Sequence, residues 1–331
     1  MSEQELFERC RAPKLNNVEF SDYYGLGYLL KKYAGVPDFV PLYFHCDHGP
    51  ALEENVLDYE LKSTYTKALF HNRLKVKDAL EKKFTEAFVT GAPFVYHRRS
   101  MGISRSAEVS GTVCFPIHST YDIDPVLDWD DYILSLKQLP PEMHPVTVCL
   151  HHVDVTKGLH RRFMDQGLQV TSAGHKWDRN FVVNFYEIIR DKKFATSNAY
   201  GSYVPYCVEF GLPFFFFGEQ EIKMKNRGNS SIKPGLSNYQ EYIDHNRQMT
   251  KYYEAKELFS SINLEVTEAQ RRFADEVLGL SDAISVEKLN KIIWNEALKN
   301  LPEILSSRLV RDSKKLIKNV KKSLKHVKII I

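Results

Sequence analysis

The sequence lacks clustered cysteines, long apolar runs and internal repeats. Its five cysteines are an odd number spread over 331 residues, and no Cys-x-x-Cys pair occurs, so neither a disulfide framework nor a zinc site is indicated. We expect these cysteines to be buried structural thiols. The longest aromatic run, Phe214 to Phe217, is far too short to span a bilayer, and the polar segment from Met1 to Arg11 is unlike a signal peptide. We therefore expect a cytoplasmic protein.

Strong charge of one sign is absent from most of the chain. The formal charge is +3 overall, but residues 308–331 contain nine Lys or Arg and one Asp. Subtracting this net +8 from +3 leaves −5 for the remaining residues. Because nucleic-acid enzymes carry positive charge on the domain surface, we predict no nucleic-acid partner. The Leu, Ile and Val residues of the basic tail recur at helical spacing, which favours peripheral binding to an anionic membrane surface; packing of this stripe on the body is the alternative.

What the sequence does have is a globular composition and an alternation of strand and helix patterns. Hydrophobic residues make up 43% and charged residues 26%, and the length suggests two domains. The alternation predicts an α/β fold with two Rossmann-like domains that face a cleft, followed by C-terminal helices. The expected divisions are residues 1–110, 111–238, 239–305 and a basic amphipathic tail at 306–331.

Strand and helix patterns alternate in both predicted domains. In the first domain we expect a strand at 39–44, a strand near 68–70, a helix at 74–84 and a strand at 87–91, and we interpret 96–110 as a loop or interdomain crossing. In the second we expect strands at 112–115, 146–150, 169–172, 194–197 and 213–217. Helices are expected between them at 129–137, 159–166, 178–190 and 203–210, and only helices from about 239 to 300.

Small polar residues follow four of the predicted strands. Ligands bind beyond the carboxyl ends of parallel strands, so these positions are the candidate site. The residues concerned are Asp47, His48 and Gly49; His118, Ser119 and Thr120; Gly174 and His175; and Ser197, Asn198, Gly201 and Ser202.

The clearest of these segments joins a strand to a helix that starts near Tyr203. Gly201 would let the backbone approach a ligand closely, and Ser202 would lie at the helix N-terminus, where free N–H groups favour a phosphate. The alternative is an ordinary N-cap serine.

Two histidines at strand ends are candidates for phosphate binding or proton transfer. His118 could hydrogen-bond a phosphate, and His48 is the candidate catalytic base with Asp47 as its orienting carboxylate. For both histidines, a turn residue with no catalytic role is the alternative.

Two further clusters suggest metal ligands, but we predict no metal. Asp122 and Asp124 form an Asp-x-Asp pattern within a loop rich in acidic residues, which favours a solvated loop. His151 and His152 precede Asp154, but adjacent residues at a strand end point in opposite directions. We interpret this pair as part of a pocket rim.

The segment from Gly201 to Pro213 resembles the donor-binding segment of GT-B glycosyltransferases of bacterial surface polysaccharide synthesis. In those enzymes a Ser-rich strand end leads into a helix, and Gly-x-Pro, here Gly211 to Pro213, leads into the next strand. The pair His118-Ser119 is similar to a nucleotide-side segment of sialyl-, Kdo- and glycerophospho-transferases. Asp47-His48-Gly49 is similar to the first strand end of the glycerophosphotransferases. The resemblance covers about 39–218.

This resemblance implies a metal-independent transfer of a sugar from a nucleotide-sugar donor to a glycan or lipid-linked acceptor. The nucleotide would lie on the second domain and the acceptor on the first. Here His118 is followed by Ser instead of Pro, and the first domain is short for the family. A nucleotide-sugar epimerase of the same architecture and a non-catalytic binding protein are the alternatives.

Overall fold

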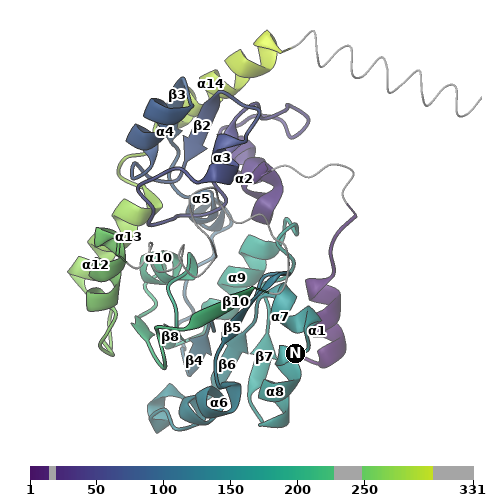
Figure 1. The fold of residues 1–331 in the computed structure, drawn as a ribbon, viewed down its shortest axis with the longest axis vertical. Helices are drawn as coiled ribbons and strands as arrows, with labels where there is room; N and C mark the ends of the chain where they lie inside the picture. Colours follow the sequence, from purple (N-terminus) through teal and green to yellow (C-terminus); the bar gives the residue numbers. More distant parts are fainter. Residues whose placement is uncertain (15–19, 227–247, 301–331) are drawn as a thin grey trace, which may run out of the picture.

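The computed structural model describes residues 1–14, 20–226 and 248–300. Within them the chain forms two parallel β-sheets, each covered by helices, in a small upper and a larger lower lobe (Figure 1). This confirms the predicted α/β class with C-terminal helices. No helix in the described ranges is long and apolar enough to cross a membrane. The predicted basic tail lies outside the described residues.

The lower lobe is built on a five-stranded parallel sheet in the order β7-β6-β4-β8-β9. Its strands are β4 (Thr112–Cys114), β6 (Val146–Cys149), β7 (Gln169–Thr171), β8 (Phe194–Ser197) and β9 (Phe214–Phe216). Chain order therefore reverses between the neighbouring strands β4 and β8, so the loops after these two strands flank the switch point of the sheet.

Helices cover both faces of this sheet because successive strand residues point to opposite sides. Phe194 and Phe215 belong to a core with α1, α6 and α8, whereas Ala195 and Phe214 belong to a core with α5, α9 and α10. The helices are α1 (Glu3–Cys10), α5 (Pro93–Ser100), α6 (Trp129–Lys137), α7 (His152–Thr156), α8 (Leu159–Asp165), α9 (Phe181–Ile189) and α10 (Tyr203–Glu209). A short 3-10 helix η2 (Pro141–Met143) precedes β6.

The upper lobe holds a three-stranded parallel sheet in the order β1-β2-β3. Its strands are β1 (His45–Cys46), β2 (Lys67–Phe70) and β3 (Glu86–Val89). Its helical elements are η1 (Phe20–Gly25), α2 (Leu26–Tyr33), α3 (Asp58–Leu61) and α4 (Val76–Lys82). All three strands run parallel, as the β-α-β pattern predicts.

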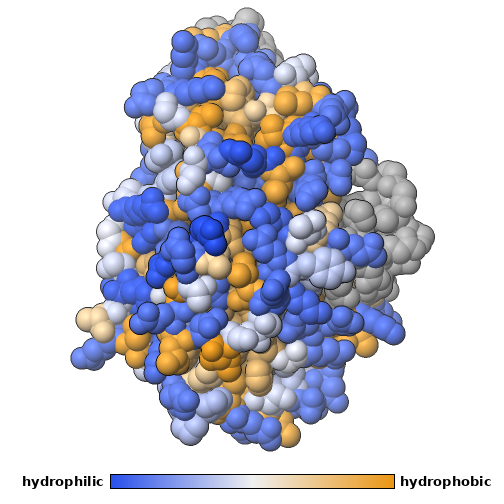
Figure 2. Space-filling view, turned by 90° about the vertical axis from the view of Figure 1, so that its left-hand side faces the viewer, coloured by the Kyte–Doolittle hydropathy of each residue, from blue (hydrophilic) through white to orange (hydrophobic). Residues whose placement is uncertain are grey.

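The C-terminal helices join the two lobes. They are α12 (Thr250–Leu258), α13 (Glu268–Leu278) and α14 (Val286–Lys299). Phe273 of α13 is buried in the core that includes α10, whereas Leu289 and Ile293 of α14 are buried in the small-sheet core. On the side that Figure 2 shows, hydrophilic residues predominate and apolar residues are interspersed among them.

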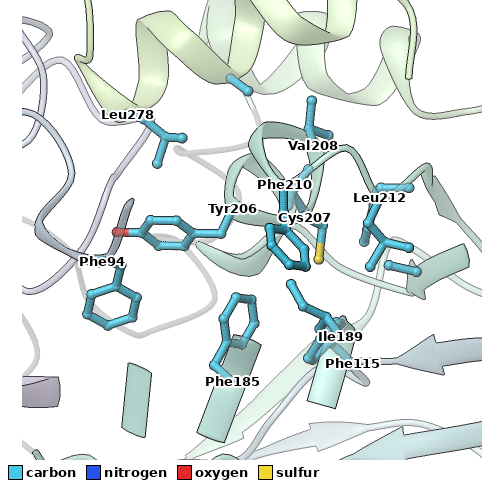
Figure 3. Packing of buried hydrophobic residues seen from close by; sticks show 14 of the residues in the cluster. Phe94, Phe115, Phe185, Ile189, Tyr206, Cys207, Val208, Phe210, Leu212 and Leu278 are labelled. Atoms are coloured by element: carbon cyan, nitrogen blue, oxygen red, sulfur yellow. The ribbon is translucent and has the colours of Figure 1, made fainter. Parts of the chain in front are cut away.

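The core beside α10 includes α5, which also packs against α2 of the upper lobe. The rings of Tyr206 from α10 and Phe94 from α5 stack with centroids 5.0 Å apart (Figure 3). Arg98 of α5 donates to the Glu209 carboxylate of α10 at 2.8 Å. The segment interpreted as a loop at 96–110 therefore begins as the end of a helix, because Pro93 suits a helix start and Arg98 finds a carboxylate.

Several other elements differ from the sequence-based expectations. The strand predicted at 39–44 is absent, and the strand starts only at His45, because Pro41 cannot donate to a ladder. The carbonyl of Val40 instead accepts from Lys31 Nζ at 3.1 Å. An antiparallel pair, β5 (Ile123–Val126) and β10 (Lys223–Asn226), was not predicted. The first helix, α1, packs beside α7 of the lower lobe, so the small lobe does not begin at residue 1.

All five cysteines are buried and free, which confirms their prediction as structural thiols.

Candidate functional site

The carboxyl ends of the two parallel sheets face each other across the seam between the lobes. The Ser202 hydroxyl, after β8, donates to the carbonyl of Pro50, after β1, at 3.4 Å. A Cβ atom added to Gly49 would lie only 2.9 Å from the same hydroxyl oxygen. The two polar strand ends predicted from the sequence therefore meet in space, and a side chain at Gly49 would displace the Ser202 hydroxyl.

The helical segment η1 carries a second connection across this seam. The Tyr23 ring lies 5.9 Å from the His48 ring and 4.8 Å from the Lys176 ammonium, measured to ring centroids. The backbone N–H of Tyr24 donates to the Lys176 carbonyl at 2.5 Å. Lys176 follows β7, so this contact links the strand end that carries His48 to the far side of the large sheet.

His48 is exposed at the seam, as a proton-accepting group should be. The surrounding protein atoms, assisted by the charge of Lys75, lower the pKa of His48. The imidazole is therefore neutral at neutral pH and able to accept a proton.

Asp47 binds a histidine that the sequence patterns did not single out. Its two carboxylate oxygens accept from His71 Nδ1 at 2.6 Å and from the His71 backbone N–H at 3.0 Å. His71 directly follows β2, the neighbour of β1, and both side chains are buried. The carboxylate expected to orient His48 therefore joins two strand ends. His71 follows the strand expected near 68–70, and the parallel register of β1 beside β2 is what brings it to Asp47.

A second buried pair lies beneath this edge. The Glu60 carboxylate accepts from Lys75 Nζ at 3.1 Å, and both side chains are almost fully buried. Burial acts to raise the pKa of Glu60, but His45 and Lys75 together lower it to about 2. Charges at this edge are therefore matched by partners within the protein.

The loop after β8 is closed by its own hydrogen bonds. The Ser197 hydroxyl is buried and lies 2.7 Å from the Tyr203 hydroxyl. A Cβ atom at Gly201 would lie 2.5 Å from the Tyr203 ring, so glycine permits this packing. Ser202 is exposed and makes no side-chain cap hydrogen bond to α10, which removes the N-cap alternative for this residue.

The loops after β4 and β8 are joined at the switch point of the sheet. Asn198 Oδ1 accepts from the Ile117 N–H at 2.8 Å, and its buried Nδ2 group has no protein partner. On the other side of the same loop, the Ser119 N–H donates to Asp154 at 3.0 Å. The Thr120 N–H donates to the Ile123 carbonyl at 2.9 Å.

Gly174, after β7, lies against the backbone of α1. A Cβ atom there would meet the Arg9 carbonyl of α1 at 3.2 Å, and its φ of +113° favours glycine.

Four histidines lie in a row over the ends of β4, β6 and β7. Neighbouring ring centroids are 4.3 Å apart for His118 and His151, 4.1 Å for His151 and His152, and 4.1 Å for His152 and His175. The sequence-based argument that His151 and His152 point in opposite directions is wrong. β6 ends at Cys149 and His151 caps α7, so the alternation of a strand no longer applies.

The Asp-x-Asp pattern does not gather ligands in the part of the chain that the structure describes. Asp124 on β5 forms an ion pair with Lys157 at 2.7 Å, and Asp122 is exposed. Across residues 1–14, 20–226 and 248–300, no group of three or more His, Cys, Asp or Glu side chains is arranged to hold a metal ion.

A surface hollow of about 430 Å³ lies elsewhere, lined by residues of α1, β7 and α9. It includes Asp191 and Lys192, which precede β8, and therefore extends toward the amino ends of the strands. We place the candidate site at the carboxyl ends, where the polar groups of both sheets converge.

Comparison with known proteins gives structural similarity only. No family model and no curated protein matches the chain. The wall teichoic acid polymerase TagF shares 12% identity at a TM-score of 0.41, over 78% of this chain and 69% of TagF. The UDP-GlcNAc 2-epimerase from Neisseria meningitidis, bound to UDP-GlcNAc, shares 11% identity at a TM-score of 0.35, over 71% of this chain and 62% of the epimerase. Similarity at this level carries no argument about function.

Proposed function

We propose that this protein is a glycosyltransferase that moves a sugar from a nucleotide-sugar donor to a glycan or lipid-linked acceptor. The donor binds at the end of the five-stranded sheet, and the acceptor binds at the end of the three-stranded sheet. The observation that carries this proposal is the contact of Ser202 with Gly49 and Pro50, which brings the two polar strand ends together.

The donor side is the switch point between β4 and β8. Loops that flank such a point form the usual nucleotide-binding crevice of an open parallel sheet. Ser202 presents an exposed hydroxyl at the seam, and Asn198 has a buried amide group without a protein partner. Ser197 and Gly201 shape this loop through Tyr203. His118, Ser119 and Thr120 supply the facing wall, and Gly174 supports it from β7.

The acceptor side is the loop after β1. His48 is exposed and has a lowered pKa, so its neutral imidazole can take the proton of an acceptor hydroxyl. The hydroxyl oxygen then bonds to the anomeric carbon of the sugar, and the bond to the nucleotide diphosphate breaks. Asp47 stabilises this edge through His71, and no divalent metal is required.

Calorimetric titration of the purified protein with CMP, CDP, UDP, GDP and TDP tests the donor side. We expect one nucleotide to bind selectively, and we expect the Ser202→Ala variant to bind it about tenfold more weakly through loss of one hydroxyl contact at the site. Failure of all five nucleotides to bind would contradict the proposal and favour a non-catalytic binding protein.

The acceptor side is tested by activity with the nucleotide sugar of the class that binds. His48→Gln should abolish transfer while leaving donor affinity unchanged, and activity should survive chelation of divalent ions. Conversion of the donor to a free epimeric sugar, without any acceptor, would instead identify a nucleotide-sugar epimerase.

A further inference from the structure

The row of four histidines reaches from the protein surface into the interior. His118 is exposed and His151 is half-buried, whereas His152 and His175 retain only 1% and 3% of their exposed surface. The rings come from three neighbouring strand ends, and each ring touches the next. A group bound at His118 therefore contacts the outer member of a continuous row of imidazoles.

The hydrogen-bonding groups of this row are incompletely used within the protein. Both ring nitrogens of His152 and the Nδ1 atom of His151 are buried without a partner in the part of the protein that the structure describes. His118 Nδ1 donates to the Ser119 carbonyl at 2.9 Å. His175 Nδ1 accepts from the Trp177 N–H at 3.2 Å. Buried polar atoms without partners are costly, so the row is suited to a polar ligand.

The Lys176 ammonium supplies positive charge beside the row and acts on His151, His152 and His175. The Lys176 ammonium lies over the rings of Tyr23 and Tyr121, at 4.8 and 5.7 Å from their centroids. Lys157 from α7 is already paired with Asp124.

Two carboxylates lie beside the row: Asp154 interacts electrostatically with His118, and Asp178 interacts electrostatically with His175. The Asp154 carboxylate accepts from the Ser119 N–H. Asp178, which follows Lys176, accepts from the Asn180 N–H at 2.9 Å. A bound anion would therefore face Lys176 and the imidazoles next to these two carboxylates, so added positive charge on the row would favour its binding.

We infer that this row, formed by His118, His151, His152 and His175, is a phosphate-binding site that takes up one proton when a diphosphate binds to it. The inference rests on the proposed function, since the diphosphate is that of the nucleotide donor. It assigns His151, His152 and His175 to the donor side together with His118.

The row holds one proton because its members repel further charge. Burial, followed by the neighbouring rings, lowers the pKa of His151, and burial with His175 and Lys176 lowers the pKa of His152 to about 3. Burial and Lys176 also lower the pKa of His175. A bound dianion offsets this repulsion and favours the protonated row, which titrates as a coupled unit.

Calorimetric titration with sulfate, whose charge stays constant through the neutral range, tests the site without the nucleotide's own ionisation. We expect affinity to rise by about tenfold per unit fall in pH while one proton is taken up. CDP and UDP, titrated in two buffers of different ionisation enthalpy, should compete with sulfate and show the same uptake. Nitrogen-detected NMR of labelled histidine rings should show one added ring proton in the complex.

Substitutions in the row and a control substitution outside it test whether the row causes the pH dependence of sulfate binding. His151→Gln and His152→Asn should remove the pH dependence of sulfate binding. His97→Gln should not, although His97 on α5 is also half-buried with a lowered pKa caused by burial and Lys32. If a row variant does not fold, the NMR spectrum of the histidine rings in the unmodified protein is the test: an added ring proton in the complex supports the inference, and its absence contradicts it.

Nucleotide binding without proton uptake, or with uptake unchanged in the folded row variants, would overturn the inference and leave the proposed function intact. Sulfate binding with proton uptake in a protein that binds no nucleotide would support the row as an anion site and contradict the proposed donor.

Discussion

The two sheet edges that meet at the seam differ in how their buried charged and polar groups are paired. At the three-stranded sheet, Asp47 is paired with His71 and Glu60 with Lys75, so each charge has a counterpart inside the protein. At the five-stranded sheet, His152 and Asn198 keep buried nitrogens without protein partners. The charges of the first edge are paired within the fold, although His71 Nε2 has no partner among the described residues, whereas the second edge leaves both ring nitrogens of His152 available to a ligand. Four experiments test this difference, in order of decreasing expected effect.

The largest effect is expected at the paired edge. Glu60→Gln removes the negative partner and leaves the Lys75 ammonium buried, which should lower the free energy of unfolding by about 3 to 5 kcal/mol in urea denaturation. Glu81→Gln is the control, because its pair with Lys77 is exposed and should contribute within about 0.5 kcal/mol. A loss at Glu60 as small as that of the control would break the comparison.

The next experiment compares the loss of stability caused by substituting one residue of each edge. Asp47→Asn weakens both hydrogen bonds to His71 and should destabilise the protein by about 2 kcal/mol. His152→Asn removes a ring whose nitrogens have no protein partner, so it should cost less, within about 1 kcal/mol. Urea unfolding of both variants is the measurement, and a larger loss at His152 than at Asp47 would reverse the assignment of the two edges.

As the pH falls, protonation of the histidine row should lower the free energy of unfolding before protonation of the carboxylates does. The unfolded-state pKa of His152 is 6.5 and its folded pKa is about 3, so the unfolded chain binds the proton first as the pH falls. The free energy of unfolding should therefore decrease by about 1.4 kcal/mol for this histidine at about pH 5.5.

Glu60 behaves differently over the same range. Its lowered pKa of about 2 contributes stability that is complete above its usual value of 4.5 and is lost only between 4.5 and 2. Thermal melting between about pH 7 and pH 5 should therefore respond to His152→Asn and be insensitive to the Glu60–Lys75 pair. Equal slopes for the unmodified protein and the His152 variant would contradict this separation.

The smallest effect on stability is expected at Ser202. Its side chain does not cap α10 and makes only one long contact, at 3.4 Å, so Ser202→Ala should change the free energy of unfolding by less than about 0.5 kcal/mol. This makes the variant a clean probe of nucleotide binding. A loss near 1 kcal/mol, as for a capping serine, would instead assign Ser202 a structural role.

The elements with clear local signals were predictable from the sequence. The helix at Trp129–Lys137 has Asp128 as its N-cap, and its limits agree with the prediction. The large-sheet strands were recognised from short apolar runs with Gly at helix ends, such as Gly167 and Gly211. The strand expected at 39–44 was misplaced because apolar content alone does not reveal that Pro41 prevents pairing.

Residues of the site were predictable one strand end at a time, but their partners were not. His48, His118 and Ser202 were identified because they follow predicted strands. His71 also follows a predicted strand, near 68–70, but its pairing with Asp47 depends on the register of β1 beside β2. The contact of the His151 ring with the His152 ring was missed because it depends on the strand ending two residues before His151.

The sequence by itself determined the α/β class, the alternation of strands and helices, and the polar residues at the ends of the strands, because these depend on local periodicity and turn chemistry. The tertiary structure decided which of those ends meet: Ser202 with Gly49, Asp47 with His71, and four histidines with one another. Strand order and lobe packing set these contacts, since they join residues far apart in the chain through hydrogen-bond ladders and buried surfaces that no local pattern encodes.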